Sequence, residues 1–240
     1  MRVAVVSDIH ANLVALDAVL AAAGPVDRVW HLGDVVGYGP DPDGVVARLT
    51  ERDAFGVRGN HDAAACGGDE IDWFNPEARE ALEWTRRKIS PRTRAWLEAL
   101  PERRSEGDFT LVHGSPRDPL WEYITSVAVA RANLAALDTR IGLHGHTHVP
   151  IAFRDEDGRI EAISPAPDSQ LSLDERQVLL NPGSVGQPRD GDPRAGWMVI
   201  DTDTGRCSWH RVAYDIAAVQ EAMTAAGLPA RLIGRLTYGV

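Results

Sequence analysis

The chain has 240 residues and a mass of 26.1 kDa, a length that one α/β domain often reaches, so we expect a single domain over residues 1–240. Hydrophobic residues make up 44% of the chain, which excludes a disordered or fibrous protein. The 25 Lys and Arg residues against 35 Asp and Glu residues give a net charge of −10. Because such a surface repels polyanions, we do not expect the protein to bind nucleic acid.

The sequence shows no targeting or membrane segment. Its apolar runs are too short to cross a bilayer, and Asp8 and Asp17 interrupt the N-terminal stretch that a signal peptide would need. The two cysteines, Cys66 and Cys207, form neither a disulfide framework nor a metal or redox motif. We therefore expect a cytoplasmic protein without membrane contact, and the sequence leaves its oligomeric state open.

The first sixty residues alternate between short apolar runs and helical patterns. Strands are predicted at 3–6, 29–32 and 54–57. One helix is predicted between Asn12, which can cap it, and Gly24, and another over 44–53. This alternation predicts parallel βαβ units.

The middle of the chain is predicted to be helical. Asn75-Pro76 and Ser90-Pro91 each place a capping residue before a proline and so predict helices over 77–89 and 92–100. Between residues 86 and 104 the chain has seven basic residues against two acidic ones. We interpret this basic stretch as a solvated helix face, with a positive wall near an anionic substrate as the alternative.

The second half of the chain is predicted to consist mainly of short strands. A helix over 127–137 separates strands at 109–112 and 141–143, and a polar loop at 164–174 and a final helix over 216–226 follow. The remaining strands are predicted at 151–154, 159–163, 177–180, 196–200 and 207–212. No internal repeat and no long linker divides the chain.

Residue types that bind metals follow several predicted strands. They occur in five segments: Asp8-Ile9-His10, Gly33-Asp34, Gly59-Asn60-His61-Asp62, His113-Gly114 and Gly145-His146-Thr147-His148. Because ligands bind outside the carboxyl ends of parallel strands, these loops can converge. Each segment alone is a weak signal, but five of the 8 histidines fall within them. Carboxylates, an amide oxygen and imidazoles suit Mn, Fe, Co or Zn better than Ca or Mg.

The order of these segments resembles that of the calcineurin-like metallophosphoesterase superfamily: D-x-H, G-D, G-N-H-[DE], H and G-H-x-H. The motifs cover residues 1–150, and the strand pattern extends the resemblance to the rest. The resemblance implies an α/β fold, a four-layer αββα sandwich of two mixed β-sheets flanked by helices. It further implies one metal held by Asp8, His10, Asp34 and His148, and a second held by Asp34, Asn60, His113 and His146, with the Asp34 carboxylate bridging.

The chemistry of two metals agrees with that assignment. Two divalent ions about 3.5–4 Å apart need a shared anionic ligand, and a carboxylate can bridge whereas a neutral imidazole cannot. We expect two divalent transition-metal ions (Mn, Fe, Zn or Co), with Mn the most active, and attack on phosphorus by a hydroxide that bridges them. His61 resembles the family's histidine that is not a ligand and acts as general acid for the leaving oxygen.

The segment at residues 33–39 departs from the protein Ser/Thr phosphatase branch, whose motif is G-D-x-x-D-R-G. Here G-D-V-V-G-Y-G lacks both the second Asp, which orients the acid in that branch, and the Arg, which binds phosphate. A phosphoprotein phosphatase is therefore disfavoured. The residue that orients His61 stays open, with Asp62 as a candidate.

Substrate contacts are predicted from residues beside the motifs. The candidates are Asn12, Arg58, Arg117 and Arg189, since a guanidinium binds phosphate in a bidentate manner. Their structural alternatives are a helix cap for Asn12 and ordinary ion pairs for the arginines. The turn at residues 181–184 resembles a segment near the site in small bacterial relatives, although it also suits a plain turn.

The sequence thus predicts a binuclear phosphoesterase that hydrolyses a small phosphodiester or phosphomonoester, nucleotide derivatives included. A nuclease is an alternative that the net charge opposes and only the basic stretch supports. A non-catalytic scaffold with the same fold, such as the retromer subunit, is the other alternative. Retention of every ligand position and of His61 opposes it.

Overall fold

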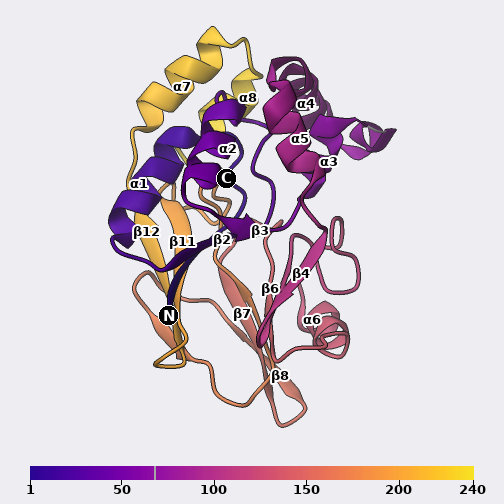
Figure 1. Cartoon of the computed structure of the whole chain (residues 1–240), viewed down its shortest axis with the longest axis vertical. Coiled ribbons are helices and arrows are strands. Elements are labelled where there is room, and N and C mark those ends of the chain that lie inside the picture. Colours follow the sequence, from indigo (N-terminus) through magenta and orange to yellow (C-terminus); the bar gives the residue numbers. More distant parts are fainter. Residues whose placement is uncertain (68) are drawn as a thin grey trace.

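The computed structural model describes residues 1–67 and 69–240 (Figure 1). Within them, two mixed sheets of six strands have the orders β3-β2-β1-β11-β12-β9 and β4-β5-β6-β10-β7-β8. The first sheet consists of β1 (Arg2–Val6), β2 (Arg28–His31), β3 (Phe55–Gly56), β9 (Gln170–Ser172), β11 (Ala195–Asp201) and β12 (Arg206–Val212). The second consists of β4 (Arg103–Glu106), β5 (Phe109–Val112), β6 (Ile141–Leu143), β7 (Ile151–Glu156), β8 (Arg159–Ile163) and β10 (Val178–Asn181).

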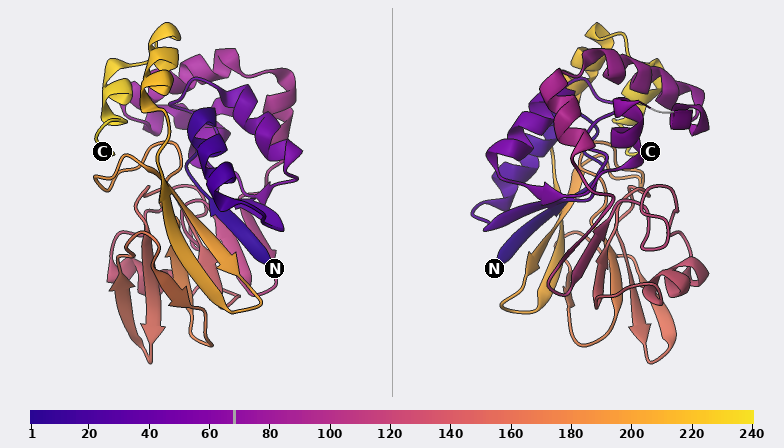
Figure 2. Two further views of the ribbon diagram at one scale, coloured as in Figure 1. Left: turned by 90° about the vertical axis from the view of Figure 1, so that its left-hand side faces the viewer. Right: turned by 45° about the vertical axis from the view of Figure 1, so that its right-hand side comes forward.

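Helices cover the outer faces of both sheets, most of them on the side of the first sheet (Figure 2). They are α1 (Leu13–Ala23), α2 (Pro42–Glu51), α3 (Asn60–Cys66), the 3₁₀ helix η1 (Asp69–Trp73), α4 (Pro76–Lys88), α5 (Pro91–Glu98), α6 (Val127–Leu134), α7 (Ile216–Ala225) and α8 (Ala230–Arg235). Helix α1 packs on β11, and α6 packs on β8 and β10 of the second sheet. The predicted fold, two mixed sheets flanked by helices, is confirmed. Among the described helices, none combines the length and the apolar character that a bilayer span requires.

The core follows from the alternation of side chains along the strands. Val3 and Val5 of β1 belong to the cluster between the two sheets, whereas Ala4 and Val6 belong to the cluster under the helices. Successive side chains of a strand point to opposite faces, so an uninterrupted apolar run is buried on both. A third cluster joins Tyr38 to α4, α7 and α8 and so fixes the C-terminal helices above the first sheet.

Both sheets contain a parallel part. Strands β1, β2 and β3 are parallel to one another, as are β5, β6 and β10. This confirms the predicted βαβ units at the start of the chain. The loops that follow these parallel strands carry the predicted metal ligands.

Several elements differ from the sequence-based expectation. Helix α2 begins at Pro42 rather than at 44 because Asp41 accepts a hydrogen bond from the Gly44 amide, the same cap-and-proline signal that α4 and α5 carry. Helix α6 ends at Leu134, not at 137. The short elements β4, β9, α3, η1 and α8 were not predicted, because each is too brief to show a hydrophobic period.

The basic stretch at residues 86–104 is not a plain solvated helix face. Arg86 Nε and Arg94 donate hydrogen bonds to the carbonyls of Ala64 and Cys66, at the end of α3. Arg103 and Arg104 lie on β4, which pairs antiparallel with β5. Arg86 of α4 and Arg94 of α5 thus join their helices to the end of α3.

Candidate metal centre

The seven predicted metal ligands meet at the carboxyl ends of the parallel strands. Asp8 and His10 follow β1, Asp34 follows β2, and Asn60 begins α3, just after β3. The others follow strands of the second sheet: His113 after β5, and His146 and His148 after β6. All seven side chains are at most 4% exposed.

The first group of ligand atoms comes from Asp8, His10, Asp34 and His148. Each residue offers one nitrogen or oxygen atom, and these atoms lie within 4.8 Å of one another. His148 Nε2 is 3.2 Å from His10 Nε2 and 3.2 Å from Asp8 Oδ1. This group could hold a metal ion.

The second group comes from Asp34, His113 and His146, again within 4.8 Å of one another. Asn60 belongs beside it, because its Oδ1 atom lies 3.0 Å from His113 Nε2, which is also 3.0 Å from His146 Nδ1. Asp34 Oδ2 lies 3.7 Å from His10 Nε2 and 3.3 Å from His113 Nε2. One carboxylate oxygen therefore stands between the two groups.

The outer ring nitrogens of three of the histidines face main-chain carbonyls. The pairs are His10 Nδ1 with Val36 O (3.3 Å), His113 Nδ1 with Leu32 O (2.8 Å) and His148 Nδ1 with Gln187 O (2.6 Å). A carbonyl oxygen can only accept, so each Nδ1 carries a hydrogen, and each Nε2 faces the cluster, where it presents a lone pair to a cation once it is deprotonated. This donor set fits a cation.

Five of these residues have a left-handed backbone conformation. The φ angles are 51° at Asp8, 50° at His10, 50° at Asp34, 65° at His146 and 60° at His148. Side chains other than glycine rarely adopt this region, and the cost is about 1–3 kcal/mol per residue. Such strain concentrated in one cluster indicates a functional site.

Glycines allow the motif loops to approach one another. A Cβ atom on Gly59 would lie 2.1 Å from Asp34 Oδ1, and one on Gly33 would lie 2.5 Å from the Gly59 nitrogen. The G-D and G-N-H segments therefore need glycine for a steric reason. The contact also brings Asp34 Oδ1 to the main-chain N–H of His61, which donates to it at 2.9 Å.

Burial and the pairing of Asp34 with His113 set the protonation of the cluster. Burial holds the pKa values of His10, His146 and His148 well below their usual range, so these rings stay neutral. Burial also raises the pKa of the Asp8 carboxyl to about 7. Burial alone would raise the pKa of Asp34, but the charge of His113 and a hydrogen bond from it outweigh that effect and lower it.

His61 lies beside the cluster and is 4% exposed. Its ring packs against the rings of Tyr38 and Phe74, with centroids 4.4 and 4.7 Å away, and burial lowers its pKa to about 4. Asp62 does not orient this ring. Its two carboxylate oxygens accept hydrogen bonds from the main-chain N–H groups of Val36 and Gly59, each at 3.0 Å, and thereby cap α3.

The turn after β10 supports the metal loops. Asn181 Nδ2 donates to the carbonyl of Gly145 at 2.8 Å, and Ser184 Oγ donates to the carbonyl of Asp8 at 2.8 Å. The turn thus fixes the backbone on both sides of the first ligand group. Of the two interpretations of residues 181–184, the structure favours the one that places them beside the site.

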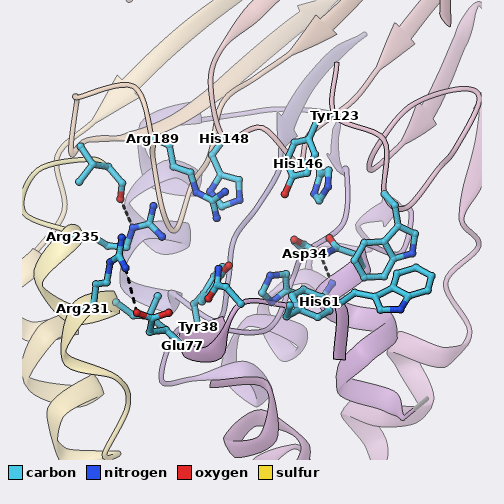
Figure 3. Close-up of a pocket in the computed structure, with 17 residues that line it drawn as sticks. Asp34, Tyr38, His61, Glu77, Tyr123, His146, His148, Arg189, Arg231 and Arg235 are labelled. Atoms are coloured by element: carbon cyan, nitrogen blue, oxygen red, sulfur yellow. Dashed lines mark hydrogen bonds and ion pairs between the residues drawn. The ribbon is translucent and has the colours of Figure 1, made fainter. Parts of the chain in front are cut away.

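The cluster opens into a cavity of about 790 Å³ (Figure 3). Among the predicted substrate contacts only Arg189 lines it. Arg58 instead pairs with Glu102 at 3.0 Å, and Arg117 pairs with Glu122 at 3.8 Å. None of the basic residues at 86–104 lines the cavity, which removes the one feature that supported a nuclease.

Asn12 also has a structural role. Its Oδ1 accepts from the Ala15 amide at 3.1 Å to cap α1, and its Nδ2 donates to the carbonyl of Gly186 at 3.2 Å. The polar atoms of Asn12, Arg58 and Arg117 thus have partners within the protein, and none of these three residues lines the cavity.

Other residues of the cavity wall were not predicted from the sequence. Arg231 and Arg235 reach it from α8, and Trp73, Trp121 and Tyr123 reach it from loops and from η1. The four-residue spacing of the arginines places them on one face of a helix, but α8 itself was not predicted. The aromatic residues carry no local signal, because their proximity arises only in the folded chain.

Known proteins share this architecture over the whole chain. The model of the calcineurin-like phosphoesterase superfamily domain matches residues 1–205. A metallophosphoesterase from Sphaerobacter thermophilus of known structure is 45% identical, covers 100% of this chain and 99% of its own, and superposes with a TM-score of 0.93. An uncharacterized protein of Methanocaldococcus jannaschii is 34% identical over 99% of this chain and 98% of its own length.

A hypothetical protein from Pyrococcus horikoshii, 22% identical with a TM-score of 0.79 over 100% of this chain and 98% of its own, shares the fold. The family match spans all the ligand-bearing loops described above. The chain therefore belongs to the calcineurin-like phosphoesterase superfamily.

Proposed function

We propose that this protein is a binuclear metal-dependent phosphoesterase that hydrolyses a small phosphodiester or phosphomonoester. One observation carries the proposal: two buried groups of ligand atoms share the Asp34 carboxylate, with Oδ2 at 3.7 Å from His10 Nε2 and 3.3 Å from His113 Nε2. Two cations at such a short separation repel each other, and a shared anionic ligand offsets that repulsion.

In this proposal Asp8, His10, Asp34 and His148 hold one ion, and Asp34, Asn60, His113 and His146 hold the other. The mixed oxygen and nitrogen donors favour Mn, Fe, Zn or Co, with Mn as the ion to test first. When bound, the ions activate water as the nucleophile and offset the negative charge of the phosphoryl oxygens.

His61 is the proposed general acid for the leaving oxygen. Its main-chain N–H is held by Asp34 Oδ1 at 2.9 Å, so its ring is positioned relative to the metal centre. Burial lowers the pKa of the ring to about 4, and a negatively charged phosphoryl group beside it would raise that pKa. As the acid, His61 must carry a proton in the substrate complex. Arg189, in the same cavity, is the proposed contact for the phosphoryl oxygens.

The test is reconstitution of the full chain. We expect chelation to abolish hydrolysis of bis-p-nitrophenyl phosphate or p-nitrophenyl phosphate, and Mn²⁺ to restore it together with two bound metal ions per chain. A protein that binds two ions but hydrolyses no ester of a broad phosphate-ester panel would instead be a scaffold with an intact metal site.

A further inference from the structure

We propose that the cavity selects a phosphate compound whose reacting phosphoryl group lies between a planar ring and a second anionic group, as in a nucleoside polyphosphate. This inference rests on the proposed function and names the substrate class of the same site. It depends on two walls of the cavity that the metal centre does not use (Figure 3).

The first wall carries the guanidinium groups of Arg189, Arg231 and Arg235. Among the described residues only Arg231 has an acidic side-chain partner, Glu77 at 3.3 Å. Arg189 donates to the amide oxygen of Gln187 at 2.9 Å, and Arg235 donates to the main-chain oxygen of Val240.

This positive charge is only partly offset from within the chain: Glu77 pairs with Arg231 and the main-chain oxygen of Val240 accepts from Arg235, whereas Arg189 has no acidic side-chain partner among the described residues. Burial and the charges of Arg189 and Arg231 lower the pKa of Arg235 below its usual value, so the three groups repel one another. The protein as a whole carries a net charge of −10, so a cavity wall with this excess of positive charge requires a specific reason. Guanidinium groups bind phosphate oxygens in a bidentate manner, and an anionic ligand would remove the repulsion.

The three arginines lie at different distances from the metal centre. The main-chain N–H of Arg189 donates to the His148 carbonyl at 3.4 Å, which places this arginine next to the first ligand group. Arg231 and Arg235 come from α8 and lie farther from His146 and Asp34 (Figure 3). Arg189 can therefore contact the reacting phosphoryl group, while the α8 pair is suited to a second anionic group.

The opposite wall is aromatic. Trp73 is 70% exposed and Tyr123 is 47% exposed, which is unusual for rings of this size. The Trp73 and Trp121 rings are 4.9 Å apart at an angle of 59°, and Tyr123 stacks on His146 with centroids 3.7 Å apart. Exposed rings of this kind stack on planar ligands such as nucleobases. Tyr123 places that stacking surface directly beside the metal centre.

The volume of the cavity agrees with a ligand that extends from the metal centre toward both the arginine wall and the aromatic wall. About 790 Å³ is within the usual range for sites of drug-sized molecules and far exceeds the needs of a single phosphate. For a nucleoside triphosphate, the oxygen of water would bond to the α-phosphorus, and the bond from that phosphorus to the bridging oxygen would break. Pyrophosphate leaves with the electron pair and a proton from His61, and the proton that water loses restores His61.

The test compares substrates on the Mn²⁺-loaded full chain. ATP has both the ring and the distal phosphates, AMP lacks the distal phosphates, and tripolyphosphate lacks the ring. We expect kcat/KM for ATP to exceed each of the other two by about tenfold or more. The double variant Arg231→Gln/Arg235→Gln should lower the ratio of kcat/KM for ATP to that for bis-p-nitrophenyl phosphate by about tenfold.

Two further variants complete the experiment. Trp73→Ala should lower the ratio of kcat/KM for ATP to that for tripolyphosphate. Arg176→Gln is the matched control, because Arg176 pairs with Glu156 on the surface and does not line the cavity. Both of its ratios should equal those of the wild type.

The outcomes separate this inference from the proposed function. Hydrolysis of bis-p-nitrophenyl phosphate without a preference for ATP, or ratios that the variants leave unchanged, would overturn the inference and leave the phosphoesterase intact. If no ester is hydrolysed, the proposed function fails. Quenching of tryptophan fluorescence by ATP then tests whether the cavity binds ATP. Quenching that the double variant weakens supports the selective cavity, and absence of quenching overturns it.

Discussion

The imidazole of His61 occupies space that only a glycine at position 37 leaves open: a Cβ atom on Gly37 would lie 2.5 Å from His61 Nδ1. In the Ser/Thr phosphatase motif an Asp stands at the position of Gly37 and orients the general acid. Here His61 Nδ1 is buried and has no hydrogen-bond partner in the described part of the chain. Packing against Tyr38 and Phe74, rather than a carboxylate, sets the orientation of the ring.

Gly37→Ala should therefore reduce turnover. The new methyl group would displace the His61 ring, so we expect kcat to fall by about tenfold or more while the bound metal stays at the wild-type level. Gly158→Ala is the matched control, because Gly158 has a φ of +88°, close to the +91° of Gly37, but nothing within 4 Å of its Cβ position. Equal losses of kcat in both variants would attribute the effect to backbone strain instead.

The predicted metal ligands come together in the structure because each lies in a short motif at the end of a parallel strand. Asp8 and His148 are 140 positions apart in the sequence, yet the order of motifs, through the family resemblance, placed them in one ligand group, and His148 Nε2 lies 3.2 Å from Asp8 Oδ1. The arginine and aromatic walls of the cavity could not be predicted in this way. Arg235 enters the cavity because the cluster of Tyr38, α4, α7 and α8 fixes α8 there, and that packing leaves no local pattern.

Two of the charged candidates beside the motifs, Arg58 and Arg117, do not line the cavity, for a related reason. Arg58 directly precedes the G-N-H segment, but its guanidinium turns to Glu102 at 3.0 Å. Sequence proximity fixes only the position of the backbone, while the side chain of an arginine reaches whichever carboxylate the fold brings near. Motifs therefore predicted residues whose place in the site follows from the position of their backbone. They did not predict which long side chains would reach the cavity.

Asp34→Asn and Asp8→Asn should differ in the number of metal ions lost. Asp34 contributes to both groups of ligand atoms and Asp8 to only one. In the Asp8 variant we expect about one ion per chain, and in the Asp34 variant fewer than one, because the shared anion is lost. Metal analysis after reconstitution with Mn²⁺ measures both. Two ions per chain in Asp34→Asn would contradict the bridging role.

His61→Ala should separate metal binding from proton transfer. His61 belongs to neither ligand group, so the metal content should not change. Turnover should fall by ~10²–10⁴-fold for esters with an alkoxide leaving group, which needs a proton, and less for p-nitrophenyl esters, whose leaving group does not. His210→Ala, on β12 away from the cavity, is the control. Equal losses for good and poor leaving groups would remove His61 as the acid.

Arg189→Gln and Arg58→Gln should affect substrate binding differently. Arg189 lines the cavity, whereas Arg58 is held by Glu102 outside it. Loss of a guanidinium that contacts the phosphoryl group should raise KM by about tenfold in Arg189→Gln. Michaelis–Menten kinetics with bis-p-nitrophenyl phosphate should show a wild-type KM for Arg58→Gln. A KM raised only in the Arg58 variant would reverse the assignment.

His31 should make the fold sensitive to acid. It is fully buried and packs on Trp96, with ring centroids 5.5 Å apart, and burial together with the charge of Arg104 lowers its pKa from 6.5 to about 3. The unfolded chain then binds a proton that the folded chain excludes, so stability falls as the pH drops below 6.5 and levels off near 3. At pH 5 the loss from this group is about 2 kcal/mol relative to pH 7.5.

The measurement is urea unfolding of metal-free protein at both pH values. His31→Gln cannot titrate, so the difference in unfolding free energy between pH 7.5 and pH 5 should shrink by about 2 kcal/mol relative to the wild type. Trp96→Phe alters the same packing but leaves the titratable ring in place, and its pH difference should match the wild type. Since the cluster histidines are common to all three proteins, their proton uptake cancels. An unchanged pH difference in His31→Gln would show that His31 does not take up a proton on unfolding.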